Sequence, residues 1–330
     1  MASGPQAGPL TGTPATPGPA VPVGPQIPDD ALGIAGAPAN WDPGRHRFRL
    51  TPRHLAALGQ LIHPGTVENE LQSDLAALAA AGIVDDGLVV PAAVDLVRAW
   101  AAPDLLVHVE TNAPSGILSH GVAIRGRIAW TVEAWPGSDI GEYAPLEPAL
   151  LVPAMARMVD LRLPPVAASG GEAARCAVSV PMAFVDRAFT AADAVGVADR
   201  PEAITIIREV GRRYQPPIRE ADITQLAVVL SGYKLSWRVT VSWDGGPVAP
   251  PAAPGDVQLR SLVVIDAGPA GFWRRETPAE PLRAEDIDPE TVVRLVPVSA
   301  KEVWAGLVEL LPELSGEPEP ARPSDRGHRR

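Results

Sequence analysis

The sequence predicts an α+β protein: a quasi-twofold duplicated unit with a central antiparallel β-sheet flanked by helical bundles. The first observation is the stretch 233–243, where apolar and polar side chains alternate without exception, as in a strand with one dry and one wet face. The second is a set of amphipathic stretches with helical spacing that precede the strands. The third is that the order helix pair, antiparallel strands, helix occurs twice along the chain.

The ends of the chain differ in composition from its middle. Residues 1–44 are rich in proline and glycine and carry few charges, so they are expected to form a disordered tail, as are residues 313–330. Between them we expect a first α+β half over residues 45–165 and a second over residues 166–312. The strands of both halves are expected to join in one continuous sheet.

The first half is predicted to begin with a short edge strand and a series of helices with recognisable ends. Thr66 is a candidate helix cap and Gly82 a candidate stop, Pro91 opens the next helix, and Pro103 ends it. The predicted helices are residues 54–61, 66–82, 91–102 and, after the strands, 146–159. The predicted strands are residues 48–50, 105–111, 117–125 and 127–135.

The second half repeats this plan after a loop of small residues at 164–174. An Asp199-Arg200-Pro201-Glu202 helix start opens one helix, and a second ends at Gly232. The predicted strands are residues 233–243, 262–265, 272–275 and 292–296, followed by a helix that runs to Leu311.

Charge and cysteine content narrow the classes of partner and site. The chain has 28 basic and 39 acidic residues, and its formal charge of −11 disfavours nucleic acid and a membrane surface, which require a concentrated basic footprint. Cys176 is the single cysteine, which excludes an internal disulfide and a multi-thiolate metal site; it is expected to be a small buried hydrophobe. The single cysteine also favours a reducing, cytoplasmic setting, and no apolar run reaches the ~18 residues that a membrane helix needs. The oligomeric state stays open.

Few residues suggest catalysis. His108 and His120 are expected to face each other across adjacent strands, and Asp266 ends a strand before Gly268. For the histidines we favour sheet packing over a metal or acid–base role, and for Asp266 simple turn chemistry. No nucleotide, hydrolase or metalloprotease motif is present, so no cofactor is expected.

The tryptophans are more informative than the histidines. Trp130, Trp237, Trp243 and Trp273 fall in predicted strands, where core packing is the default, and Trp237 lies midway along the dry face. Trp135 shares a face with Thr131 and Glu133, so it is expected to be exposed. Exposed aromatic side chains on a sheet are suited to anchoring a protein partner.

Three stretches resemble a known family. They are DLAALAAAGIVDDGLVVPAAVDLVRAWAAPDLLVHV (74–109), VVIDAGPAGFWRRE (263–276) and VVRLVPVSAKEVWAGLVELL (292–311), and they are similar to the EspG family of actinobacterial type VII (ESX) secretion chaperones. The resemblance implies a cytoplasmic, non-enzymatic protein that binds a helical export substrate, typically the PPE subunit of a PE–PPE pair. An enzyme of another family, such as a hydrolase that uses His108 or Asp266, is the alternative.

The resemblance also indicates a partner-binding segment. By position, the loop from Thr111 to Ile117 matches a family loop used in substrate contacts. Together with Trp135, the predicted site comprises Thr111, Asn112, Ala113, Pro114, Ser115, Gly116 and Ile117.

Overall fold

The structure is a computed structural model that describes residues 37–62, 68–113, 116–162, 176–195, 200–244, 257–277 and 288–312. The predicted tails therefore lie outside the described residues, except for residues 37–44. Along the described ranges, no helix is both long enough and apolar enough to cross a bilayer.

One antiparallel sheet runs through the whole molecule. In the described part of the chain it has eleven strands, in the order β1-β2-β8-β7-β6-β5-β10-β11-β12-β13-β9. Their bounds are β1 Asn40–Asp42, β2 Arg47–Leu50, β5 Leu105–Ala113, β6 Gly116–Arg125, β7 Ile128–Ala134, β8 Gly141–Pro145, β9 Val178–Pro181, β10 Leu235–Asp244, β11 Val257–Asp266, β12 Phe272–Arg275 and β13 Val292–Val298. A separate small hairpin pairs β3 (Val84–Asp85) with β4 (Leu88–Val89). The predicted fold class and the continuous antiparallel sheet are confirmed.

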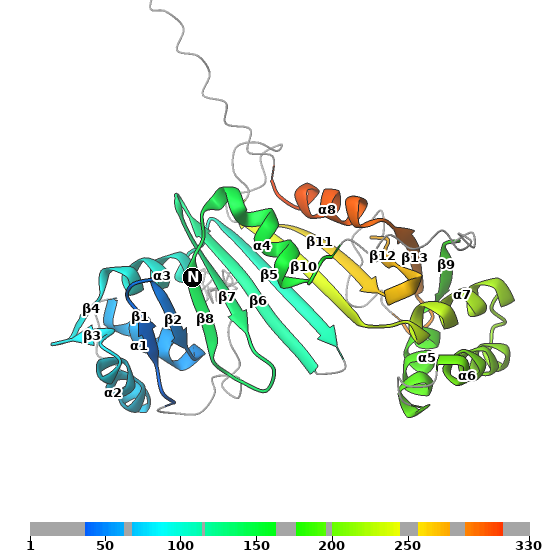
Figure 1. Cartoon of the computed structure of the whole chain (residues 1–330), viewed down its shortest axis with the longest axis horizontal. Helices are drawn as coiled ribbons and strands as arrows, with labels where there is room; N and C mark the ends of the chain where they lie inside the picture. The colour runs from blue at the N-terminus through cyan, green and yellow to red at the C-terminus, as the bar shows by residue number, and fades with distance from the viewer. Residues whose placement is uncertain are drawn as a thin grey trace, which may run out of the picture.

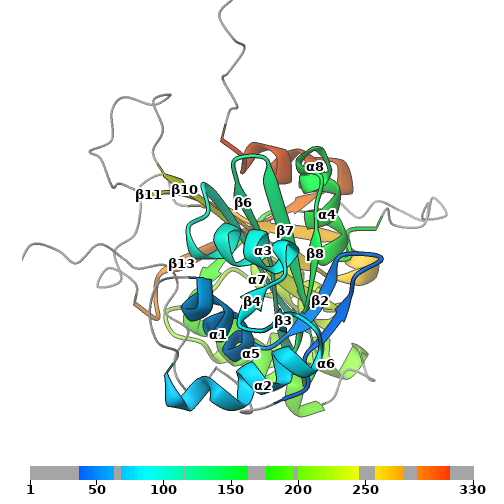
Figure 2. The ribbon, with the colours of Figure 1, turned by 90° about the vertical axis from the view of Figure 1, so that its left-hand side faces the viewer.

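Helices cover both faces of this sheet (Figure 1). The helices are α1 Pro52–Ile62, α2 Gln72–Ala80, α3 Pro91–Ala101, α4 Leu151–Met158, α5 Met182–Val195, α6 Arg200–Arg213, α7 Glu220–Ser231 and α8 Ala300–Glu309. Helices α4 and α8 lie side by side over the middle of one face, here called the two-helix face. The first helix trio (α1, α2, α3) and the second helix trio (α5, α6, α7) lie at opposite ends of the other face, here called the three-helix face (Figures 1 and 2).

The alternation of side chains along the strands explains this layering. In β5, Val107 and Val109 pack into the core beneath α4 and α8, whereas Leu106 packs with the first helix trio. In β11, Val264 faces α8 and Ile265 faces the second helix trio. Successive side chains of a strand point to opposite faces, so each strand supplies two cores at once.

The predicted dry face of residues 233–243 is confirmed in β10. Trp237, Val239 and Val241 are buried in the core of the two-helix face, while Arg238 between them is exposed. The same strand pairs with β5 on one side and β11 on the other, so it lies at the centre of the sheet.

The two halves of the chain follow the same course about a quasi-twofold axis. Leu105 opens β5 and Leu235 opens β10, 130 residues later (235 − 105), and Pro52 opens α1 and Met182 opens α5 at the same spacing (182 − 52). Each half then continues through antiparallel strands to a closing helix, α4 or α8. The sheet order places β5 and β10 next to each other, so the axis lies between them.

Local capping fixes the starts of two helices, of which the one at Pro91 was predicted. Pro91 occupies the first turn of α3, where its missing N–H costs no hydrogen bond. Ser299 begins α8 in a capping box: its hydroxyl accepts from the Glu302 amide at 3.2 Å, and the Glu302 carboxylate accepts from the Ser299 amide at 2.7 Å.

The structure corrects some of the predicted elements. Residues 40–42 form strand β1, so the tail boundary predicted after Gly44 lies too late; Trp41 stacks on Phe48 at 5.8 Å between ring centroids and holds this strand on β2. Helix α4 begins at Leu151 and not at Leu146, because Pro148 starts a short 3₁₀ turn first. The helix expected from Thr66 begins at Gln72 after another such turn, and Thr66 itself lies outside the described residues. The elements β8, β9 and α5 had no predicted counterpart.

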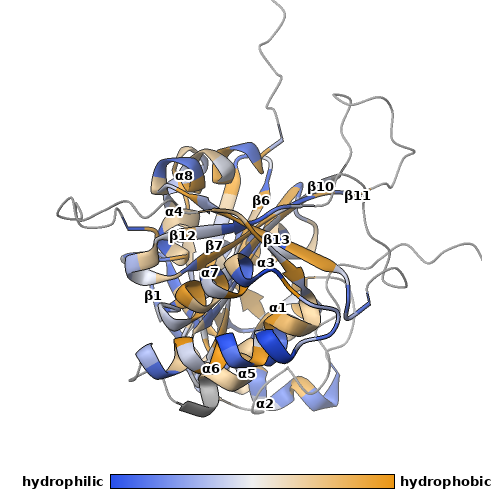
Figure 3. Ribbon diagram, turned by 90° about the vertical axis from the view of Figure 1, so that its right-hand side faces the viewer, coloured by the Kyte–Doolittle hydropathy of each residue, from blue (hydrophilic) through white to orange (hydrophobic). Residues whose placement is uncertain are grey.

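Helix α5 nevertheless carries a detectable signal. Phe184 and Ala188 are both fully buried and lie four residues apart, the spacing of one helix face. Figure 3 views this end of the molecule and shows hydrophilic and hydrophobic residues mixed within the second helix trio, as in amphipathic helices that bury one face.

Candidate partner-binding site

The segment from Thr111 to Ile117 is the end of a β-hairpin and not a loop. Strands β5 and β6 remain paired up to Ala113 and Gly116, and the two residues between them, Pro114 and Ser115, lie outside the described residues. The ladder between β5 and β10 stops earlier, at the pair Asn112–Ser236. On the other side, the ladder between β6 and β7 stops at Gly121–Val132, so the hairpin projects past its last pair with β7 over residues 116–120.

Two of the predicted site residues form an exposed pair at this tip. Asn112 and Ile117 are direct cross-strand partners, so their side chains share one face of the sheet, the three-helix face. Asn112 is exposed, and Ile117 is 68% accessible. A projecting backbone with an amide and an aliphatic side chain can contact both polar and apolar groups of a protein partner.

The other predicted residues are placed differently. Thr111 lies opposite Trp237 on the two-helix face and is only 8% accessible, so it offers a partner little surface. Ala113 is half-buried and Gly116 is exposed, with a φ of 116° that favours glycine. Gly116 therefore shapes the tip.

Trp135 lies on the other side of the sheet from Ile117. It follows directly after β7, and the alternation of that strand places it with Glu133 on the two-helix face. It is 51% accessible, which confirms its predicted exposure. A partner that contacts Ile117 on the three-helix face would have to reach around the end of the sheet to contact Trp135 as well.

A histidine fixes the backbone just before Trp135. The Ala134 amide donates to His120 Nδ1 at 3.1 Å, beyond the last ladder pair between β6 and β7, Gly121–Val132. Burial lowers the pKa of His120 below its usual value, although the nearby Glu133 carboxylate acts in the opposite direction. The neutral imidazole is the form that can accept this hydrogen bond.

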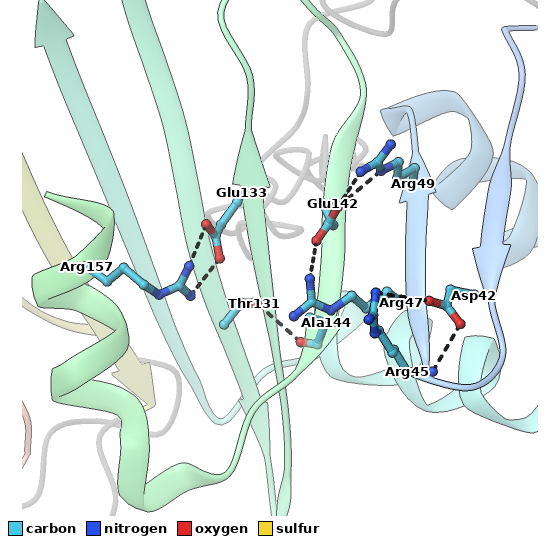
Figure 4. Close-up of polar contacts among 9 residues, drawn as sticks. All are labelled: Asp42, Arg45, Arg47, Arg49, Thr131, Glu133, Glu142, Ala144 and Arg157. Carbon is cyan, nitrogen blue, oxygen red and sulfur yellow. Dashed lines mark hydrogen bonds and ion pairs between the residues drawn. The ribbon is translucent and has the colours of Figure 1, made fainter. Parts of the chain in front are cut away.

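The surface of the two-helix face beside Trp135 is a set of ion pairs (Figure 4). Arg157 of α4 binds the Glu133 carboxylate with both terminal nitrogens, at 2.7 and 2.8 Å. Further out, Glu142 accepts from Arg47 at 2.8 Å and from Arg49 at 3.1 Å. These three arginines share two carboxylates, so each arginine has an acidic partner.

The residues considered for catalysis are not brought together. His120 is the direct partner of Val109, so His120 and His108 lie on opposite faces and the predicted histidine pair is wrong. His108 Nε2 instead contacts Ser119 Oγ at 2.7 Å. His108 and Asp266 pair with β10 at Thr240 and Leu235, five residues apart (240 − 235), about 17 Å along a strand.

Asp266 makes a local turn hydrogen bond, and Cys176 lies on the surface before a strand. Asp266 Oδ1 accepts from the Gly268 amide at 2.8 Å, which is the predicted turn chemistry. Cys176 is exposed, so its predicted burial is wrong; it precedes β9, in which Val178 and Val180 supply the buried side chains. Within the described ranges, no group of three or more His, Cys, Asp or Glu side chains could hold a metal ion.

One residue at the hairpin carries a contact that the sequence pattern does not reveal. Tyr233 was expected to start the dry face of the strand, but it precedes β10 and its hydroxyl donates to the Asn112 carbonyl at 2.6 Å. The alternation of residues 233–243 continues through Tyr233 and conceals the end of the strand. The available signal is the adjacent Gly232, which ends α7 and marks a change of direction.

Comparisons with known proteins complete the description of the site. No family model matches the sequence, and no curated protein matches it. Among solved structures, the chain is similar to the Mycobacterium tuberculosis type VII secretion system chaperone EspG5 in complex with a PE25-PPE41 dimer. The similarity has a TM-score of 0.47 and 16% sequence identity, and it covers 81% of this chain and 97% of the EspG5 chain.

Proposed function

We propose that this protein is a cytoplasmic chaperone-like binding protein that keeps a type VII secretion substrate soluble, a PPE-like helical protein of a PE–PPE pair. The observation that carries the proposal is the projecting β5–β6 tip with its exposed pair Asn112 and Ile117. The family resemblance of residues 74–109, 263–276 and 292–311 supplies the class of partner.

The proposed contact has a simple physical basis. A helical export substrate with an apolar tip self-associates in water, and covering that tip prevents the association. Ile117 offers an apolar contact, while the Asn112 side chain can bond to backbone groups at a helix end. The free energy of such a contact comes mainly from apolar burial, so moderate salt should leave it intact.

The second helix trio is the natural neighbour of this contact. Tyr233 joins the tip to the trio: its hydroxyl bonds to Asn112, and its ring packs against Phe189 of α5 at 5.2 Å between centroids. We propose that the partner lies against the tip and this trio on the three-helix face. Trp135, on the opposite face, is proposed to contact only a partner that wraps the end of the sheet.

Co-expression tests this function. Each PE–PPE pair of the source genome is produced with and without this protein, and soluble PPE and co-purification are measured at low salt and at moderate salt. We expect one pair to become soluble and to co-purify in both salts. Failure of every pair, together with turnover of a small substrate that is lost in His108→Ala or Asp266→Asn, would favour the enzyme alternative.

A further inference from the structure

Tyr233 stands where three parts of the molecule meet. Its ring is partly buried, packs against the core of the second helix trio and meets Phe189 edge-to-face, with 88° between the ring planes. Its own amide donates to the Leu230 carbonyl at the end of α7, at 3.1 Å, and the next amide, of Lys234, donates to the Asp266 carbonyl of β11, at 2.9 Å. The side chain thus extends from a rigid base.

The hydroxyl of Tyr233 continues the sheet where its ladder ends. The last pair between β5 and β10 is Asn112–Ser236. The hydroxyl bridges the two members of this pair: it donates to the Asn112 carbonyl at 2.6 Å, accepts from the Ser236 amide at 3.1 Å, and lies 3.1 Å from Ser236 Oγ. One donor and two acceptor positions are all that a phenol offers, so its hydrogen-bonding capacity is fully used.

The bond between the Tyr233 hydroxyl and Asn112 has no equivalent in the other half of the quasi-twofold repeat. Tyr233 lies 130 residues after Pro103 (233 − 103), which occupies the equivalent place between α3 and β5. Proline has no hydroxyl and cannot make the corresponding bond to Ser242, the equivalent of Asn112 (242 − 112 = 130). The two halves therefore differ at this point, and the hairpin β5–β6 is the one tied to a helix trio through a tyrosine.

We propose that Tyr233 is a positioning residue for partner binding: it holds the β5–β6 tip at a fixed angle to the second helix trio, so that one partner can contact both. This inference rests on the proposed function and adds to it a residue that need not contact the partner. Fixing the tip before association lowers the conformational entropy that binding would otherwise cost.

The test compares Tyr233→Phe, which removes only the hydroxyl, with Tyr214→Phe as a matched control. Tyr214 also belongs to the second helix trio region, but its hydroxyl donates to Glu290, at 2.9 Å, and not to the hairpin. Amide hydrogen exchange is measured over residues 112–118, and the dissociation rate is measured for the PE–PPE pair that the wild-type protein retains in the co-expression screen.

We expect exchange at the tip to become about fivefold faster in Tyr233→Phe, the effect of one net hydrogen bond, and to stay unchanged in Tyr214→Phe. Dissociation of the PE–PPE pair should accelerate by a similar factor in Tyr233→Phe alone. Unchanged exchange at the tip would overturn the inference, and so would faster exchange with an unchanged dissociation rate. A wild-type protein that retains no PE–PPE pair overturns the proposed function, while exchange still decides whether Tyr233 fixes the tip.

Discussion

Val109 and Val239 are direct cross-strand partners in the middle of the sheet, and both are fully buried. They are also 130 residues apart (239 − 109), the spacing that relates the two halves of the chain. The quasi-twofold axis therefore passes through this pair. Each half presents one helix trio on the three-helix face, and the proposed partner site uses only one of these two related ends.

Trp237→Ala should destabilise the fold by about 3–5 kcal/mol, as large aromatic truncations in cores do. Trp237 is 2% accessible beneath α4 and α8. Urea unfolding measures the change, with Trp135→Ala as the exposed control, for which we expect a change within about 0.5 kcal/mol. A loss of partner binding with unchanged stability in Trp237→Ala would place the interface on that face instead.

Two amino-terminal truncations should behave differently. Removal of residues 1–36 is expected to leave the melting temperature unchanged, because their composition offers little apolar area for a core. Removal of residues 1–44 also deletes β1 and the stacking of Trp41 on Phe48, so the melting temperature should fall. Equal melting temperatures for the two truncations would show that β1 contributes nothing to stability.

Two glycine substitutions should have opposite signs. Gly59 lies inside α1 with no atom within 4 Å of an added Cβ, so Gly59→Ala should stabilise the protein by about 0.5–1 kcal/mol. At Gly232 an added Cβ would lie 2.4 Å from the Ala267 carbonyl oxygen, so Gly232→Ala should cost about 1–3 kcal/mol. Thermal or urea unfolding measures the change in stability of each variant. A stabilising Gly232→Ala would contradict the packing of α7 on the turn after β11.

Stability should fall as the pH drops below neutrality, in part through two histidines. Burial lowers the pKa of His54 and of His120 below 6.5, so the unfolded chain takes up protons at a higher pH than the folded protein. The contribution of these two histidines to the free energy of unfolding is complete above pH 6.5, and it is lost as the pH falls through their folded-state pKa. His120→Asn should reduce the fall in melting temperature between about pH 7.5 and about pH 5.5. An unchanged pH dependence would show that His120 is not a source of it.

The sequence predicts most of the buried positions, but it does not always predict the face of the sheet on which a given side chain lies. The alternation in β10 and the Pro91 start of α3 are local signals, and the structure confirms them. The pairing of His108 with His120 fails because Val109 is the true partner of His120, and a register shift of one residue moves a side chain to the other face. Register depends on the geometry of the hairpin tip, which strand periodicity does not encode.

The sequence located the candidate segment, but it predicted the exposure of only some of the side chains in it. Trp135 was correctly expected to be exposed, and Ile117 of the predicted segment is exposed as well, but Thr111 is buried because β5 continues to Ala113. Tyr233 could not be assigned from sequence, since its bond to Asn112 joins residues 121 apart in the chain. Short elements such as β8 and β9 were missed because four or five residues seldom show a clear period.

The central claim, that the β5–β6 tip binds a PE–PPE-type partner, is tested most directly by the affinity of Ile117→Asp. The matched control is Leu88→Asp, the same change in charge at a side chain 74% accessible in β4, beside the first helix trio. Both changes are at exposed positions, so both variants should melt like the wild-type protein. Titration calorimetry with the PE–PPE pair retained in co-expression should show at least about a tenfold loss of affinity, about 1.4 kcal/mol, for Ile117→Asp and none for Leu88→Asp. Equal affinity of Ile117→Asp and the wild-type protein for that pair would contradict the claim.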